Sequence, residues 1–323
     1  MSKKQLTQEE VLAAKQEMKK IAYSSNREDQ IARIINETYD PEFPVPEIIS
    51  SIFNVATAES HEVVYYFVPT LPEKKAYVLA SGCVVTQIAV TPTAKNTLAM
   101  VPVVTPDYYI CLGDLLNGEH NVLDLYAEDI LEALNREEIY SVLALVDAGA
   151  IARGNVFAPD SGKTKLEYPK LVEMKKSIRK YGKKLVLITG GQVTDDVELM
   201  QYDANKFQGV NIKDVVDMWI PLESLEVTID GVVKEVISED VAYLVAVSDS
   251  KRNKPGYFVR RKISSNILAG LNDTTIVDKE RAIIVTGSNK ATATVERFAK
   301  GIAGLEEIGA VLTNSYCVAK FER

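Results

Sequence analysis

One long stretch of the chain has the hydrophobic pattern of an amphipathic α-helix. Between residues 123 and 148, apolar side chains recur at steps of three and four in two successive lines, and Gly and Pro are absent. Gly149 stands where a left-handed C-terminal cap would end such a helix. The pattern predicts a rod of about 25 residues and ~38 Å that other elements pack across, although an ordinary long core helix would show the same pattern. The two lines are Leu123, Ala127, Ile130 and Leu134, then Ile139, Val142 and Val146.

The first 60 residues carry two short helical patterns joined by polar and proline-containing linkers. A capping box at Thr7–Glu10 precedes the first pattern, and the second spans residues 26–35. Pro44 and Pro46 are expected to keep the following residues extended. Each pattern has a single apolar stripe, so we predict an N-terminal arm over 1–60 that leans on another subunit. A helical hairpin packed on the same chain is the alternative.

The pattern changes to β between His61 and Cys111. Runs rich in Val, Tyr, Ile and Thr are broken by prolines and separated by polar turns at 71–75 and 91–96. We predict an extended β-loop over 61–110, which would lie on a partner because a two-stranded ribbon is barely stable alone. An internal sheet under the long helix would also fit. The charged turn residues proposed to contact a neighbouring subunit are Glu73, Lys74, Lys75 and Lys95.

The second half of the chain mixes short helices with strands, which makes the fold class α+β. A hairpin with an Asp230-Gly231 turn is the clearest local signal, because both turn positions need positive φ. The predicted elements are a helix at 168–182, a buried strand at 183–189, a helix at 195–200 capped by Thr194, a strand at 215–220, the hairpin at 225–237, strands at 242–248, 257–263 and 281–285, a helix at 291–299 and a final strand at 311–321.

Composition and charge narrow the class of protein. The 323 residues are 46% hydrophobic and 25% charged, with a net charge of −8, so the chain lacks the basic excess of a dedicated nucleic-acid binder. No run approaches 18 apolar residues, and we expect no membrane span. Cys83, Cys111 and Cys317 are odd in number and widely spaced, which favours reduced thiols over disulfides or a zinc site.

Motifs for catalysis or cofactor binding are weak. Ser161–Thr164 resembles the end of a phosphate-binding loop, but Phe157 stands where that loop needs glycine. His61 and His120 are the only histidines, and neither has a nearby histidine or cysteine with which to form a metal site. We therefore predict no catalytic residue, cofactor or metal. An enzyme whose site is not recognisable remains the alternative, and Asp195, Asp196 or His120 would then take part.

Two groups of charged residues could contact a neighbouring subunit. Glu137 and Glu138 lie on the long helix, where a solvated or an intersubunit face would place carboxylates. A basic group could contact DNA or an acidic surface of a neighbour, although a solvated turn is the simpler explanation. This basic group is Lys251, Arg252, Arg260 and Arg261.

The order of these parts resembles the major capsid protein of tailed phages, the Hong Kong ninety-seven type of fold that encapsulin shells share. The resemblance covers nearly the whole chain in architecture but depends on no short motif. The segments that carry it are the spine helix at 123–150, the helix at 168–182, the strand, turn and short helix at 185–200, and the terminal strand at 308–321.

The resemblance implies a division of the chain into named parts. These would be an N-terminal arm at 1–60, an extended β-loop at 61–110, the spine helix of a peripheral domain at 111–150, an axial domain at 151–220, peripheral-domain strands at 221–275, and C-terminal strands of the axial domain at 276–323.

The resemblance also implies a structural function. Hexamers and pentamers would tile an icosahedral shell around packaged double-stranded DNA, in a virion assembled in the host cytoplasm. Separate scaffolding, portal and decoration proteins would be partners, because no long extension precedes the first apolar helix to serve as a fused scaffold. An encapsulin-like compartment around an enzyme cargo would use the same fold.

Overall fold

The computed structural model describes most of the chain outside the first 44 residues. It covers residues 45–67, 95–106, 108–109, 122–207, 212–222, 226–229, 232–248, 254–263, 279–286 and 301–323, together with residues 20 and 30. Several predictions lie outside this part: the two N-terminal helices, the turn residues Glu73, Lys74 and Lys75, the basic residues Lys251 and Arg252, His120, and the helix at 291–299.

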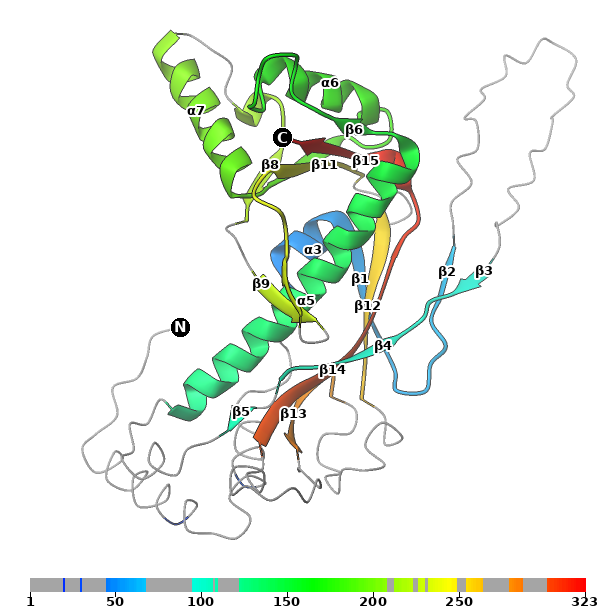
Figure 1. Ribbon diagram of the computed structural model, residues 1–323. Coiled ribbons are helices and arrows are strands. Elements are labelled where there is room, and N and C mark those ends of the chain that lie inside the picture. Colours follow the sequence, from blue (N-terminus) through cyan, green and yellow to red (C-terminus); the bar gives the residue numbers. More distant parts are fainter. Residues whose placement is uncertain are drawn as a thin grey trace, which may run out of the picture.

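The predicted long helix is present and crosses the molecule diagonally (Figure 1). Helix α5 spans Val122–Arg153, a length of 32 residues or about 48 Å. The prediction that Gly149 ends it is wrong. The helix continues past this glycine to Arg153. Gly149 instead permits close packing, because a Cβ there would lie 2.2 Å from Leu312 Cδ2. Gly154, with φ of +65°, follows the last helical residue and takes the left-handed conformation that a glycine C-cap favours.

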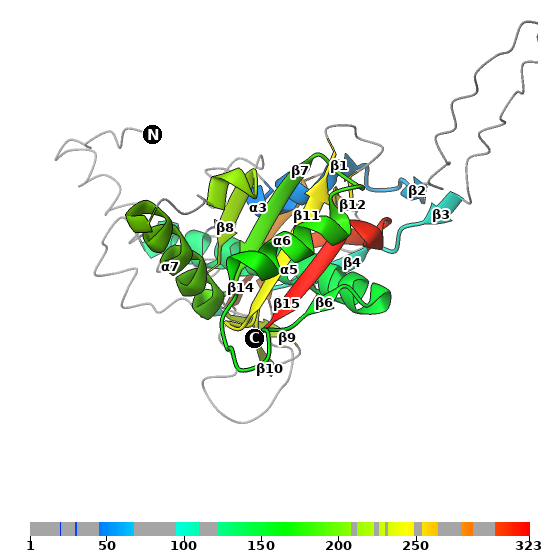
Figure 2. The ribbon, with the colours of Figure 1, turned by 90° about the horizontal axis from the view of Figure 1, so that it is seen from above.

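One face of α5 packs against a five-stranded sheet with the order β6-β15-β11-β7-β8 (Figures 1 and 2). Helices α6 and α7 pack on the other face through a second apolar cluster. Because both faces are covered, all seven residues of β11 are buried. The bounds are β6 Val156–Phe157, β15 Val318–Glu322, β11 Val241–Val247, β7 Lys184–Thr189, β8 Met218–Pro221, α6 Tyr168–Ile178 and α7 Gly191–Phe207.

Strand alternation sorts the side chains of this sheet between its two faces. Leu187 and Leu244 pack with α6 and α7, whereas Ile188 and Val245 pack with α5. The apolar run of β7 was predicted as a buried strand, and this is confirmed.

The predicted short helix after β7 is wrong in its start and length. Helix α7 begins at Gly191 and has 17 residues, so Thr194 lies inside it instead of capping it. The Thr194 hydroxyl lies 2.7 Å from the Thr189 hydroxyl, which joins the helix to the end of β7. Helix α6 also ends earlier than predicted, at Ile178 instead of residue 182.

A six-stranded sheet forms the other half of the molecule around one long strand. The first half of β14 pairs with β13 and its second half pairs with β12. Strands β4 and β5 also pair with β14. Strand β1 pairs parallel to β12. The bounds are β1 Phe53–Ala58, β4 Val101–Val104, β5 Tyr108–Tyr109, β12 Gly256–Arg261, β13 Arg281–Thr286 and β14 Gly301–Leu312.

The predicted terminal strand at 311–321 is two strands in two different sheets. Strand β14 ends at Leu312, the 3₁₀ turn η4 covers Ser315–Cys317, and β15 then enters the five-stranded sheet. Residues 301–307 were not predicted as a strand, because their two glycines and two adjacent glutamates do not have the pattern of a buried strand.

The end of the predicted N-terminal arm belongs to the body of the chain. Helix α3, Glu47–Ile52, begins directly after Pro46, so the prediction of extended residues there is wrong. Ile49, Ile52 and Phe53 are fully buried in the cluster that surrounds α5. This part of the arm therefore packs on its own chain.

Smaller elements complete the described part. The predicted hairpin is confirmed as β9, Glu226–Ile229, paired with β10, Val232–Glu235. Strand β2, Tyr65–Phe67, pairs antiparallel with β3, Lys95–Thr97, and this pair lies to one side of the two large sheets (Figure 2). The 3₁₀ turn η1 covers Ile212–Asp214. Within the described residues, no helix is both long enough and apolar enough to cross a membrane.

The chain passes between the two sheets several times. Strand β11 lies in the five-stranded sheet with β7, whereas β13 and β14 lie in the six-stranded sheet with β1 and β12. Strand β15 then returns to the five-stranded sheet.

Candidate functional site

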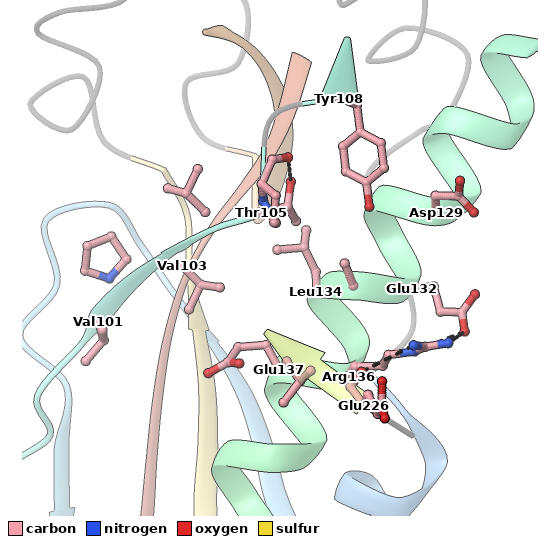
Figure 3. Close-up of a pocket in the computed structure, with 15 residues that line it drawn as sticks. Val101, Val103, Thr105, Tyr108, Asp129, Glu132, Leu134, Arg136, Glu137 and Glu226 are labelled. Carbon is pink, nitrogen blue, oxygen red and sulfur yellow. Dashed lines mark hydrogen bonds and ion pairs between the residues drawn. The ribbon is translucent and has the colours of Figure 1, made fainter. Parts of the chain in front are cut away.

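A groove of about 590 Å³ lies between the first half of α5, the strands β4 and β5, and the start of β9 (Figure 3). Three segments far apart in the sequence meet there. The lining residues are Val101–Pro106, Tyr108, Asp129, Glu132, Ala133, Leu134, Arg136, Glu137, Glu226 and Val227.

The apolar side of the groove comes from β4. This strand pairs with β14 along one edge, and Val101 and Val104 are 56% and 52% exposed. Thr105 fixes the end of β4, because its backbone N–H donates to Gly304 O at 3.0 Å and its hydroxyl accepts from Gly304 N–H at 2.8 Å. The lack of a side chain at Gly304 also lets α5 approach, since a Cβ there would lie 2.5 Å from Ile130 Cγ2.

The opposite side of the groove is acidic. Helical spacing places Asp129 and Glu132 on the exposed face of α5. Arg136 is the only cation in the lining, and it pairs with Glu132 and donates to Glu226 O at 3.3 Å. Together with Glu137, four carboxylates face one guanidinium, so the groove carries net negative charge beside exposed valines.

Tyr108 lies between these two sides. Partial burial raises the pKa of its phenol, and the nearby Asp129 carboxylate raises it further, so the hydroxyl keeps its proton at neutral pH. Its ring meets Tyr126 edge-on, with centroids 6.5 Å apart. The lining holds neither His nor Cys, and the described residues contain no group of three or more metal-binding side chains.

Behind the groove, a buried ion-pair network joins α5 to the six-stranded sheet. Glu138 is fully buried and accepts hydrogen bonds from Arg260 Nε at 2.6 Å and Arg260 Nη2 at 2.8 Å. Arg281 Nη2 lies 3.0 Å from Glu138 Oε1, and Arg281 Nη1 donates to Asn135 Oδ1 at 2.9 Å. Glu306, directly across β13–β14 from Arg281, pairs with it.

The network contains two carboxyl groups, of Glu138 and Glu306, and two guanidinium groups, of Arg260 and Arg281. Burial opposes the charge on Arg260, but its bonds to Glu138 raise its pKa. Burial raises the pKa of Glu306, and the charge of Arg281 opposes this effect. Glu306 Oε1 is buried and accepts no hydrogen bond from the described residues. A buried network of this kind holds helix and sheet in one relative position, because losing one partner leaves an uncompensated charge.

The structure corrects two of the predicted intersubunit contacts. Glu138 and Arg260 are 0% and 1% exposed, so the prediction of a surface role is wrong for both, and they pair with each other inside the chain. Glu137 lines the groove, and Arg261 is partly buried, with its Nη1 2.6 Å from Glu307 Oε1. Lys95 lies in β3.

The described residues among those considered for an enzyme site do not form one site. Asp195 is exposed on α7, whereas the buried Asp196 accepts a hydrogen bond from Leu166 N–H at 3.0 Å. His61 is exposed in a turn. In the loop that resembles a phosphate-binding motif, Lys163 pairs with Glu167, and the next helix begins only at residue 168.

The sequence did contain a signal for the buried network. Glu138 lies four residues after Leu134 and four before Val142, which places it on the buried stripe of α5. A carboxylate at such a position requires a buried cation, and the chain supplies two from strands more than 120 residues away.

Comparison with known proteins identifies the fold. No protein-family model and no curated protein sequence matches the chain. A solved structure from Mycobacterium phage Cain matches with a TM-score of 0.51 and 14% identity, over 90% of this chain and 96% of that one. One from Microbacterium phage Oxtober96 matches with a TM-score of 0.51 and 12% identity, over 88% and 92%. The virus-like particle from Pyrococcus furiosus aligns with a TM-score of 0.48 and 9% identity, over 91% and 98%. The chain therefore shares its fold with the two phage structures, which confirms the fold that its resemblance to tailed-phage capsid proteins predicted.

Proposed function

We propose that this chain is a structural shell subunit, the major capsid protein of a tailed phage, and not an enzyme. The observation that carries the proposal is a fold shared with two phage structures along about nine-tenths of the chain. Hexamers and pentamers of the chain would form an icosahedral shell around packaged double-stranded DNA. The completed shell would be part of the virion, with assembly in the host cytoplasm.

The surface of the described residues supports the proposal that neighbouring subunits cover part of this chain. Val63, Tyr65, Val101 and Val104 are exposed on or next to strands β2 and β4. Exposed apolar side chains gathered on one region are typical of protein contact sites. Heterologous contacts between such surfaces close into rings when the rotation allows it. The groove, with valines on one side and carboxylates on the other, would accept a neighbour that presents apolar and basic side chains.

The predicted parts take roles within this proposal. The β2–β3 pair would be the base of the extended β-loop, the five-stranded sheet would be the axial domain, and the six-stranded sheet would belong to the peripheral domain. The intersubunit contacts still proposed are Glu73, Lys74, Lys75, Lys95, Glu137, Lys251, Arg252 and Arg261. Scaffolding, portal and decoration proteins would be separate partners.

The net charge of −8 is compatible with enclosing DNA without gripping it. Tight binding requires neutralisation of many phosphates, which an acidic subunit does not offer overall. No cofactor and no membrane take part in the proposal.

Negative-stain electron microscopy and light scattering on the purified protein test the proposal across salt and protein concentration. We expect closed shells, or rings of five and six subunits, alone or after co-expression with the neighbouring genes of its locus. Nuclease-protected DNA inside the shells would identify a capsid, whereas a protein cargo would identify an encapsulin-like compartment. A monomer or dimer under every condition, with co-expression included, would refute a shell function.

A pair of matched variants tests the groove itself. Val104→Asp adds a fifth carboxylate beside the exposed valines and should prevent assembly without unfolding the subunit. Val233→Asp is the control, because Val233 is 60% exposed on β10, outside the groove lining. Equal assembly of both variants would remove the groove from the contact surface.

A further inference from the structure

A dense group of cations gathers at the end of α6, outside the groove. Six of the ten residues from Lys175 to Lys184 are Lys or Arg, and none of the ten is acidic. The turn η1 adds Lys213 to the same place. We call this group the α6-end cluster: Lys175, Lys176, Arg179, Lys180, Lys183, Lys184 and Lys213.

The α6-end cluster surrounds a hollow of about 320 Å³. The last turn of α6, the loop to β7 and the turn η1 each contribute to it. Lys175 Nζ donates to Val215 O at 2.8 Å, and Asp217 Oδ2 accepts from Leu185 N–H at 2.7 Å, so the hollow has fixed walls. Its charged lining is Lys175, Arg179, Lys183 and Lys213 with the carboxylates Asp214 and Asp217, a net charge of +2.

Three of these cations differ from most others in the described chain. The side chains of Lys176, Arg179 and Lys183 have neither an ion pair nor a hydrogen bond with described residues, and all three are exposed. Elsewhere, basic side chains pair with carboxylates, as Lys170 does with Asp160 at 2.9 Å and Lys320 does with Asp147 at 2.9 Å. In a chain with a net charge of −8, the lining of this hollow nevertheless holds four cations and two carboxylates.

Local helix chemistry does not account for the whole cluster. The helix dipole favours Lys175 and Lys176 in the last turn of α6. The helix dipole does not explain the cations that lie on β7 and η1. Arg179 also follows Lys175 by four residues, a spacing at which like charges repel and reduce stability. A bound anion would remove this repulsion.

We infer that the α6-end cluster binds the phosphate backbone of duplex DNA. Lys176, Lys180 and Lys184 lie outside the lining of the hollow, so the positive surface extends further than one small anion would need. A linear polyanion would contact both the cations that line the hollow and the cations around it. Lys and Arg contacts to phosphate position DNA without reading its sequence, which suits contents of any sequence. The inference rests on the proposed function, since it assigns this surface to the enclosed DNA.

The binding should be weak and salt-dependent. If Lys176, Arg179 and Lys183 each neutralise one phosphate, the logarithm of the binding constant falls with the logarithm of salt with a slope of about −2.7, or about 40-fold between 50 and 200 mM salt. This strength is compatible with DNA that must enter and leave the shell.

Fluorescence anisotropy with a mixed-sequence duplex tests the inference on the purified full-length chain. The variant K176Q/R179Q/K183Q should lose roughly tenfold or more in affinity at 50 mM salt, and most of its salt slope. The control K163Q/K165Q/K170Q removes the same charge around the other end of α6 and should bind like the unmodified chain. Electron microscopy of all three proteins reports shell formation separately.

The first three of the following outcomes would overturn the inference, and the last would overturn only the shell proposal. Absence of DNA binding by the unmodified chain at 50 mM salt, or equal losses in variant and control, would remove the DNA site without affecting the shell proposal. Loss of shells with unchanged DNA binding would make the cluster an intersubunit contact. Saturable binding of inorganic pyrophosphate with unchanged DNA binding would make it a small-anion site. If no shells form but the variant alone loses DNA binding, the shell proposal fails and the DNA site stands.

Discussion

The five-stranded and six-stranded sheets both pack on α5, but they bury different chemistry against it. In the five-stranded sheet, apolar side chains alternate between α5 on one face and α6 with α7 on the other. In the six-stranded sheet, Phe53, Phe258 and Ile308 also pack in the apolar cluster around α5. Strand β14 adds Gly304, where α5 approaches closely, and Glu306 in a buried ion-pair network. The same helix is therefore held by hydrophobic burial against both sheets, and against the six-stranded sheet also by paired charges near its middle.

This difference predicts how each sheet responds to substitution. Hydrophobic contacts are non-directional and tolerate changes that conserve volume. A buried charge pair depends on each partner, because a lone buried charge is costly. The placement of β14 against α5 therefore depends more on buried charges and on glycine than on a pattern of apolar residues.

The largest loss of folding stability is expected from Glu138→Ala. It leaves Arg260 and Arg281 buried without one of their carboxylates, and should lower the free energy of unfolding by about 3 to 5 kcal/mol. Urea unfolding of the unassembled subunit measures it. A loss below about 1 kcal/mol would mean that water reaches the network and that the two sheets differ less than their burial indicates.

Leu244→Ala tests the five-stranded sheet on the same scale. Leu244 is fully buried in the centre of β11, and its truncation should cost about 2 to 5 kcal/mol through lost burial and the cavity left behind. Leu244→Met conserves volume and should cost less than about 1.5 kcal/mol. If the methionine variant were as unstable as the alanine variant, the core would depend on shape more than on apolar area.

Gly304→Ala should cost about 1 to 3 kcal/mol, because the added Cβ meets Ile130 on α5 and the helix must shift. The double variant with Ile130→Val should recover part of this loss, since it shortens the clashing side chain. Thermal unfolding of both variants measures the effect. No recovery in the double variant would assign the loss to the strand backbone.

The pH dependence of stability should differ between Glu306 and its neutral substitute. Burial beside Glu138 raises the pKa of Glu306 against the opposing charges of Arg281 and Arg260, so the folded chain holds this proton more tightly than the unfolded chain. Stability is then highest below the usual glutamate range and falls as pH rises toward the folded-state pKa. Urea unfolding at about pH 5 and about pH 8 should show a larger fall for the unmodified chain than for Glu306→Gln. Equal falls would show that Glu306 is already ionised at the lower pH.

The smallest loss of folding stability is expected from Arg136→Gln. It breaks the exposed Arg136–Glu132 pair on the groove side of α5, and such pairs contribute about 0 to 1 kcal/mol. Urea unfolding of this variant beside Glu138→Ala compares an exposed ion pair with a buried one on the same helix. A loss comparable to that of the Glu138 variant would show that the groove is less open to solvent than its exposed residues indicate.

The sequence predicted the apolar half of this fold better than the charged half. The helix stripe through Ile130 and Val142, the runs of β7 and β11, and the Asp230-Gly231 hairpin follow patterns that local chemistry determines. Most of strand β14 was missed, because Gly304 and Glu306 are poor strand formers in isolation and become favourable only beside α5 and β13.

The groove could not be predicted for a related reason. Its sides come from residues near 101, 129 and 226, and no periodicity links segments so far apart. Glu137 was proposed as a contact because it is acidic and helical, and it does line the groove. The same argument placed Glu138 on the surface, because charge alone does not show which turn of a helix faces the core.

The order of strands in the five-stranded sheet also has a consequence for the timing of synthesis. Strand β15 lies between β6 and β11, so the sheet is incomplete until residue 322 has left the ribosome. At about 5 to 20 residues per second, the stretch from β11 to β15 takes roughly 4 to 15 s to translate, during which β11 has an unpaired edge. A nascent chain thus cannot present a finished five-stranded sheet, and its association with other copies would be delayed until translation has passed the last strand.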